Sequence, residues 1–216
     1  NLAETRVDPG LANRAGVYLR RCYQALEPRR RWPAKDIFKH YPLPGSVIDA
    51  GLLAEEGRAL SLWGDAGWGQ LVRDGKYAGH RFADELVDGC LQMIQEWNPA
   101  PAPAWVTCIP SLTHPELVPD FARRLAGRLG LPFAAALRKV RQNQQQKRMQ
   151  NSYQQAKNLD GAFAIQPDLI RPGPVLLVDD MVDSRWTFTV AAALLRQAGC
   201  TTAFPMALAL NSPRAD

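Results

Sequence analysis

The sequence predicts an α/β fold, a mainly parallel sheet with helices on both faces, together with an N-terminal helical and basic appendage. Two observations support this prediction. From residue 105 onward, apolar segments of strand length alternate with segments of helical periodicity. The strand segments are continuously apolar, which is typical of strands buried on both faces. With 216 residues, 46% of them hydrophobic, the chain is long enough to bury a sizeable core.

Residues 1–46 are predicted to form one helix and a basic, Pro-rich linker. Apolar residues recur at helical spacing over residues 11–26, and prolines and a glycine interrupt the chain from there to about residue 46. Residues 14–39 carry eight cations against two acids, with aromatic residues between them. This pattern suits contact with a nucleic-acid backbone, and a solvated basic surface is the alternative. The candidate nucleic-acid contacts are Arg29, Arg30, Arg31 and Trp32.

Residues 47–216 are predicted to form the main domain, with a first part at 47–100 and a core at 101–216. In the first part, residues 58–77 mix Gly and Trp in the manner of a compact, turn-rich unit. Residues 86–97 then place apolar side chains on one helical face, and a Pro-rich run ends the pattern.

The predicted core opens with a strand at 105–109. Thr113 and Glu116 have the spacing of a capping box, which predicts a helix over 116–129. Apolar segments follow at 133–140, 161–165, 174–180 and 202–210, with a helix from about 187 to 198 between the last two. Pro205 predicts that the last strand lies at an edge of the sheet or is irregular.

The stretch VLLVDDMVDSRWT at residues 175–187 is the strongest chemical signal. Its apolar strand runs directly into Asp179 and Asp180, and a short polar turn leads into the next helix. Ligands of open α/β sheets bind beyond the carboxyl ends of the strands, where the turn into a helix offers free N–H groups to an anion. Adjacent strand residues point to opposite faces, so one acid can reach ligand hydroxyls while the other braces the loop or a bound metal. A sugar diol next to a phosphate suits such a site.

This stretch resembles the phosphoribosyl-diphosphate (PRPP) signature of type I phosphoribosyltransferases. The resemblance implies that Asp179 and Asp180 hold the ribose 2′ and 3′ hydroxyls. It also implies that Ser184 and Thr187 join backbone amides around the 5′-phosphate. Asp183 matches the acid that faces the base in purine-specific members, and it is the candidate catalytic residue.

Arg185 departs from the family pattern, which has a small residue, usually Gly, at this position. A small residue adopts backbone conformations that cost other residues about 1 kcal/mol or more. Two alternatives follow: the Arg185 guanidinium grips a phosphate, or it fills the pocket and prevents PRPP binding. The resemblance also brings Trp186 into the ligand-binding stretch. It implies Mg²⁺ as the cofactor, held between diphosphate and ribose hydroxyls beside Asp179 and Asp180, with no metal site made by the protein alone.

Further segments resemble the ComF-like branch of this family, which is linked to DNA uptake. They are GQLVRDGKYAG (69–79), CIPS (108–111) and NLDGAFAI (158–165). In that branch a Gln-rich lid precedes the last segment. Here residues 142–158 would form the lid, with Lys147 able to reach a diphosphate.

The chain is most similar to the C-terminal phosphoribosyltransferase-like domain of some bacterial RecQ-family DNA helicases. The segments that carry this resemblance are LEPRRRWP (26–33), EEGRALSLWGDAGWG (55–69), NSYQQAKNLDGAF (151–163) and 175–187. The resemblance implies DNA as a partner and a helicase portion elsewhere in a longer chain. The start at Asn1 predicts such a fragment.

Several function classes lack a sequence signal. The four cysteines form no C-x-x-C pair and the three histidines form no H-E-x-x-H motif, so neither a disulfide framework nor a zinc site is indicated. No apolar run approaches the ~20 residues of a membrane span, and the expected location is the cytoplasm. Three hypotheses stay open: a ligand-sensing module, an active PRPP-dependent transferase, and a fold without a ligand site.

Overall fold

The computed structural model describes residues 20, 22–141 and 151–211. The strands are β1 (Gln24–Leu26), β2 (Gly57–Leu62), β3 (Trp105–Cys108), β4 (Leu137–Lys139), β5 (Phe163–Ile165), β6 (Val175–Val182) and β7 (Ala203–Leu210). The α-helices are α2 (Gly69–Asp74), α3 (Asp84–Trp97), α4 (Leu117–Leu129), α5 (Ser152–Lys157) and α6 (Trp186–Gln197). Short helical turns lie at Ala50–Leu52, Gly75–Gly79 and Pro167–Leu169.

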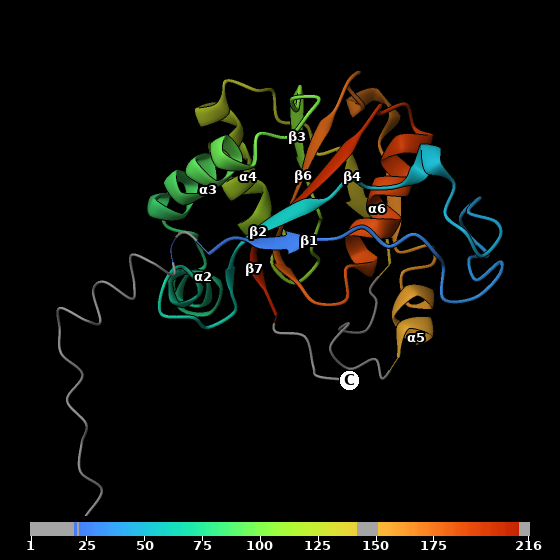
Figure 1. Ribbon diagram of the computed structural model, residues 1–216, viewed down its shortest axis with the longest axis horizontal. Coiled ribbons are helices and arrows are strands. Elements are labelled where there is room, and N and C mark those ends of the chain that lie inside the picture. The colour runs from blue at the N-terminus through green and yellow to red at the C-terminus, as the bar shows by residue number, and fades with distance from the viewer. Residues whose placement is uncertain (1–19, 21, 142–150, 212–216) are drawn as a thin grey trace, which may run out of the picture.

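The central sheet has five strands in the order β1-β2-β7-β6-β3 (Figure 1). Strands β2, β7, β6 and β3 run parallel, and β1 pairs with β2 antiparallel. The predicted mainly parallel sheet is therefore confirmed. Strands β4 and β5 form a separate antiparallel pair.

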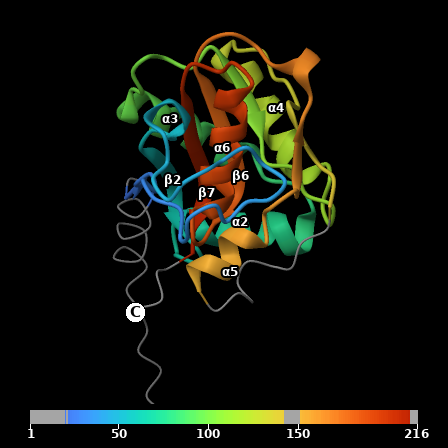
Figure 2. The ribbon, with the colours of Figure 1, turned by 90° about the vertical axis from the view of Figure 1, so that its right-hand side faces the viewer.

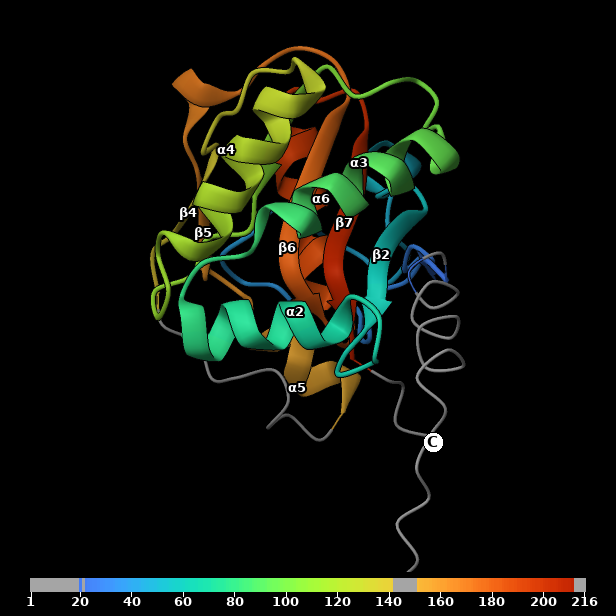
Figure 3. The same ribbon diagram turned by 90° about the vertical axis from the view of Figure 1, so that its left-hand side faces the viewer.

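Helices cover both faces of this sheet, as predicted. Figure 3 shows α2, α3 and α4 in front of one face, where their apolar stripes pack into one buried cluster. Helix α6 covers the other face, and the chain between β1 and β2 crosses in front of it (Figure 2). A second buried cluster fills this side. The sheet strands contribute to both clusters, because alternate residues of a strand point to opposite faces.

The N-terminal prediction is wrong where the structure describes it. Residues 24–26, expected to end a helix, form strand β1. Residues 27–46, expected to be a linker, pack into the core through Trp32, Phe38 and Leu43, which are all buried. These anchors are irregularly spaced between prolines, so no helical or strand period reveals them. Residues 1–19 and 21 of the predicted appendage lie outside the described residues.

Two strand predictions also need correction. The stretch 58–77, expected to be turn-rich, begins with most of β2, which is an inner strand. Pro205 lies in β7, which is also an inner strand, so neither the edge position nor an irregular strand is correct. Pro205 precedes the first β2–β7 pair, Arg58 with Met206, so its missing N–H interrupts no pair between these two strands.

The predicted capping box at Thr113 and Glu116 does not form. Helix α4 begins at Leu117 with Glu116 as its N-cap, and no side chain caps it. Instead, the Ser111 hydroxyl accepts the amides of Thr113 and His114 (3.3 and 3.2 Å) and shapes the turn before the helix. The helix stripes predicted at 86–97 and 116–129 are confirmed as α3 and α4. None of the helices described is long and apolar enough to cross a membrane.

Candidate functional site

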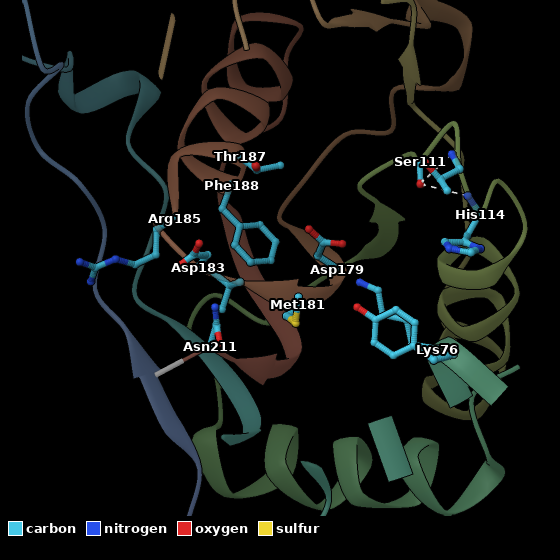
Figure 4. A pocket seen from close by; sticks show the side chains of 13 residues that line it. Lys76, Ser111, His114, Asp179, Met181, Asp183, Arg185, Thr187, Phe188 and Asn211 are labelled. Atoms are coloured by element: carbon cyan, nitrogen blue, oxygen red, sulfur yellow. Dashed lines mark hydrogen bonds between the residues drawn. The ribbon is translucent and has the colours of Figure 1, made fainter. Parts of the chain in front are cut away.

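A cavity of about 310 Å³ opens at the carboxyl ends of the parallel strands (Figure 4). Its lining comes from the last residues of β6 and from the segments that follow β2, β3, β6 and β7, because parallel strands end at the same edge of the sheet. A second cavity of about 210 Å³ adjoins it through shared side chains. The residues that line both cavities are Lys76, Ser111, Thr113, His114, Asp179 and Thr187.

Asp179 and Asp180 lie near the end of β6, as the sequence predicts. Asp179 lines both cavities and accepts the amide of Asp180 at 2.8 Å, whereas Asp180 lines only the smaller cavity. Burial raises the pKa of Asp179 well above its usual range, and the neighbouring charge of Asp180 raises it further. Lys76 and Lys139 oppose this shift in the pKa of Asp179.

Lys76 pairs with the second acid. Its Nζ lies 2.8 Å from Asp180 Oδ2, and the two side chains are only 16% and 13% exposed. Burial opposes the charged form of Lys76, but the Asp180 carboxylate outweighs burial, so the pKa of Lys76 is raised. Lys76 belongs to the turn Gly75–Gly79 with π-type hydrogen bonding, a rare element that often occurs at functional sites.

Lys76 was missed as a site residue in the sequence interpretation. The only local signal is its position between glycines in GQLVRDGKYAG. Gly75 is needed there, because a Cβ atom would lie 2.8 Å from the Phe82 ring and 2.9 Å from the Arg81 carbonyl oxygen. The close approach of this backbone to Phe82 holds the start of the turn, and with it Lys76, against the end of the sheet.

The turn after β6 has a left-handed residue where the family pattern predicts a small one. Arg185 has φ 67° and ψ −2° and is the N-cap of α6. Its guanidinium points away from Asp179 in Figure 4. It donates from Nη1 to the carbonyl oxygen of Glu27 at 3.3 Å. The backbone conformation thus agrees with the expected preference for Gly, although the residue itself is Arg.

The first turn of α6 is suited to an anion. Arg185, the N-cap residue, makes no side-chain capping hydrogen bond to this 12-residue helix, and the helix dipole adds positive potential at its N-terminus. Thr187, whose side chain carries a hydroxyl group, lines both cavities, and the exposed Asp183 lines the larger one. Ser184, predicted beside the phosphate, lines neither cavity.

Two residues predicted to contact ligand or nucleic acid are instead buried. Trp186 is 1% exposed and Trp32 is 4% exposed, and their rings stack with centroids 6.2 Å apart. Arg29 packs over the Trp186 ring at 4.2 Å and donates from Nε to the Ser184 carbonyl oxygen at 2.7 Å. Burial, with repulsion from Arg185, lowers the pKa of Arg29 to about 10. These residues therefore support the turn from behind.

The remaining residues predicted to contact a ligand or nucleic acid differ in where they lie. Arg30 and Arg31 are exposed, so they stay available for a partner. Lys147 lies outside the described residues. His114 lines both cavities with Ser111 and Thr113. Only the fold brings these loop residues next to β6.

The site fits a protein-bound Mg²⁺ poorly. Carboxylate oxygens are suitable ligands for Mg²⁺, but Asp180 already carries the Lys76 ammonium group. Within residues 20, 22–141 and 151–211, no group of three or more His, Cys, Asp or Glu side chains is arranged to hold a metal ion. A cation at this site would have to compete with Lys76.

Comparison with known proteins gives matches only among solved structures. No family model and no curated protein matches the chain. An adenine phosphoribosyltransferase structure is 21% identical, with a TM-score of 0.39, over 58% of this chain and 69% of that chain. The Saccharomyces cerevisiae adenine phosphoribosyltransferase, complexed with an imino-altritol bisphosphate and adenine, is 20% identical, with a TM-score of 0.38, over 58% and 68%. These overlaps are partial, and the fold itself defines an α/β protein with a mainly parallel sheet.

Proposed function

We propose that this chain is a phosphoribosyltransferase-like domain that binds a phosphoribosyl or nucleotide ligand in the cavity at the end of β6. The single observation that carries the proposal is the continuity between Asp179 and the first turn of α6, which border one cavity. Asp179 offers a hydroxyl acceptor, and the uncapped amides of α6 offer donors to a phosphate. A sugar phosphate satisfies both groups at once.

The charges around the turn favour the same ligand. Arg29 and Arg185 lie close enough for each other's charge to matter, and no carboxylate in the described residues forms an ion pair with either. Two cations next to an uncapped helix start raise the local positive potential. A phosphate dianion in the turn would relieve their repulsion.

The wider context is proposed from the sequence resemblance. The domain would belong to a RecQ-family ATP-dependent DNA helicase and act in DNA repair, recombination or uptake. DNA contact through the basic segment now depends on Arg30 and Arg31, because Arg29 and Trp32 support the turn.

The alternative is an active, Mg²⁺-dependent phosphoribosyltransferase that displaces diphosphate from PRPP. The acid pair at the end of β6 favours it. The Lys76–Asp180 pair speaks against its metal requirement, because the ammonium occupies one of the two carboxylates. Diphosphate release in the presence of any purine or pyrimidine base would establish this alternative.

Calorimetry with ribose 5-phosphate and with PRPP tests ligand binding, and fluorescence anisotropy with single-stranded DNA across salt concentrations tests the DNA contact. We expect heat from both phosphoribosyl ligands. Asp179→Asn combined with Asp180→Asn should abolish this heat, whereas Asp168→Asn, at an exposed acid on another turn, should not. Salt-sensitive DNA binding without ligand heat would sink the ligand-binding proposal.

A further inference from the structure

We propose that Lys76 takes the place of a divalent cation, so that this chain binds PRPP without Mg²⁺. The inference rests on the function proposed above and deepens it. It concerns the lysine that lines both cavities and contacts the acid pair.

The position of Lys76 is fixed by its surroundings. Its Nζ forms a 2.8 Å ion pair with Asp180 and is largely shielded from solvent. The preceding Gly75 is buried and packs too closely against Phe82 for a side chain, which restricts where the turn can run. The ammonium group is therefore part of the folded site rather than a mobile surface charge.

Two lysines lie at the acid pair. Lys76 contacts Asp180. Lys139 lines the smaller cavity with both acids, and its positive charge opposes the rise in the pKa of Asp179. Two lysines thus face two carboxylates. A divalent cation entering here would meet the ammonium groups of Lys76 and Lys139, whereas Mg²⁺ sites depend on anionic oxygens that are not already paired.

Lys76 can also supply what the metal would supply to the ligand. An ammonium group has three donors, and the pair with Asp180 uses one of them. The other two can reach ribose hydroxyls or diphosphate oxygens in the cavities that Lys76 lines. Lysine commonly binds phosphate oxygens as a point charge.

The test measures the affinity for PRPP by calorimetry in excess EDTA and in excess Mg²⁺, with ribose 5-phosphate as a second ligand. For the unaltered chain we expect the two PRPP dissociation constants to agree within about threefold. Lys76→Met should weaken PRPP binding in EDTA by about tenfold or more, and Mg²⁺ should restore it because the Asp180 carboxylate is then free. Lys76→Arg keeps the charge and Lys35→Met removes an exposed lysine, so both should remain independent of Mg²⁺.

The outcomes separate the inference from the proposed function. If ribose 5-phosphate binds but PRPP binds only with Mg²⁺, the inference is overturned and the ligand site stands. If neither ligand binds under either condition, the proposed function fails and the inference fails with it. The comparison of EDTA with Mg²⁺ on the unaltered chain needs no variant, so the test holds even if Lys76→Met does not fold.

Discussion

At the scale of single residues, Asp179 is in a position that costs the folded state stability. It is a carboxylate in a shielded position next to a second carboxylate, and both effects raise its pKa. Ionisation of such a group costs the folded state free energy. Acids that are kept at positions where they cost stability are typical of binding and catalytic sites.

Asp179→Asn should therefore stabilise the fold while it removes ligand binding. The Asn side-chain oxygen can still accept the Asp180 amide, but no charge is buried. We expect the free energy of unfolding at pH 7 to rise by about 1 kcal/mol or more. Because the folded-state pKa of Asp179 is raised, the wild-type chain recovers this difference as the pH falls through that pKa. Urea unfolding at neutral and mildly acidic pH measures both effects, and a loss of stability at pH 7 would contradict the interpretation.

At Arg185 the residue type does not suit the backbone conformation. Its φ of 67° is a conformation that Gly adopts without strain. Arg185→Gly should raise the free energy of unfolding by about 0.5 to 1 kcal/mol. Affinity for ribose 5-phosphate should fall severalfold, because the variant removes one of the two cations that raise the positive potential at the turn.

The control for Arg185→Gly is Arg185→Ala, which removes the guanidinium but keeps a Cβ atom at positive φ. Alanine should not gain stability, since the strain remains. An affinity for ribose 5-phosphate that stays unchanged in both variants would mean that the Arg185 charge does not favour the ligand. Thermal unfolding and calorimetry distinguish these results.

At the scale of elements, the sequence revealed those whose periodicity is strong. Strand β3 and the first half of β6 are largely apolar runs and helices α3 and α4 have clear stripes, so all four were predicted. Strand β2 was missed because flanking Gly and Trp residues resemble a turn. In the site, Asp179 and Asp180 were predictable because they directly follow the apolar run that begins β6. Lys76 was not, because only the parallel order of β2, β7 and β6 brings it to them.

The segment between β1 and β2 supports the turn after β6, and Arg29 makes contacts with this turn. The guanidinium joins the Trp186 ring to the Ser184 carbonyl. Arg29→Met should lower the free energy of unfolding by about 1 to 2 kcal/mol and weaken ribose 5-phosphate binding several-fold. Arg30→Met, at the exposed neighbour, should change neither quantity. Equal effects of the two variants on ligand binding would mean that the basic charge matters and the support does not.

At the scale of the whole molecule, the segment between β1 and β2 crosses one side of the molecule and forms hydrogen bonds with residues far along the chain. Asp160 accepts the amides of Lys39 and His40 and the His40 ring nitrogen, each at 2.9 Å. The Tyr41 hydroxyl group donates to the Phe163 carbonyl oxygen nearby at 3.0 Å. Sequence analysis treated this segment as a linker, because contacts across about 120 positions leave no local pattern.

These hydrogen bonds predict how the stability of the fold changes at acidic pH. Burial opposes the charged form of Asp160, but the hydrogen bonds from His40 and Lys39 outweigh burial, so its pKa is lowered. A carboxyl group whose folded-state pKa is depressed stabilises the fold above its unfolded pKa of about 4, and this contribution is lost as the pH falls through the folded value. Asp160→Asn should therefore lower the free energy of unfolding by about 1 to 3 kcal/mol at pH 7, and the difference from the wild-type chain should shrink near pH 3. Urea unfolding across this pH range, with the exposed Asp168→Asn as the control, measures it. If the difference in the free energy of unfolding between Asp160→Asn and the wild-type chain stayed constant with pH, the carboxylate charge of Asp160 would not be what holds the segment in place.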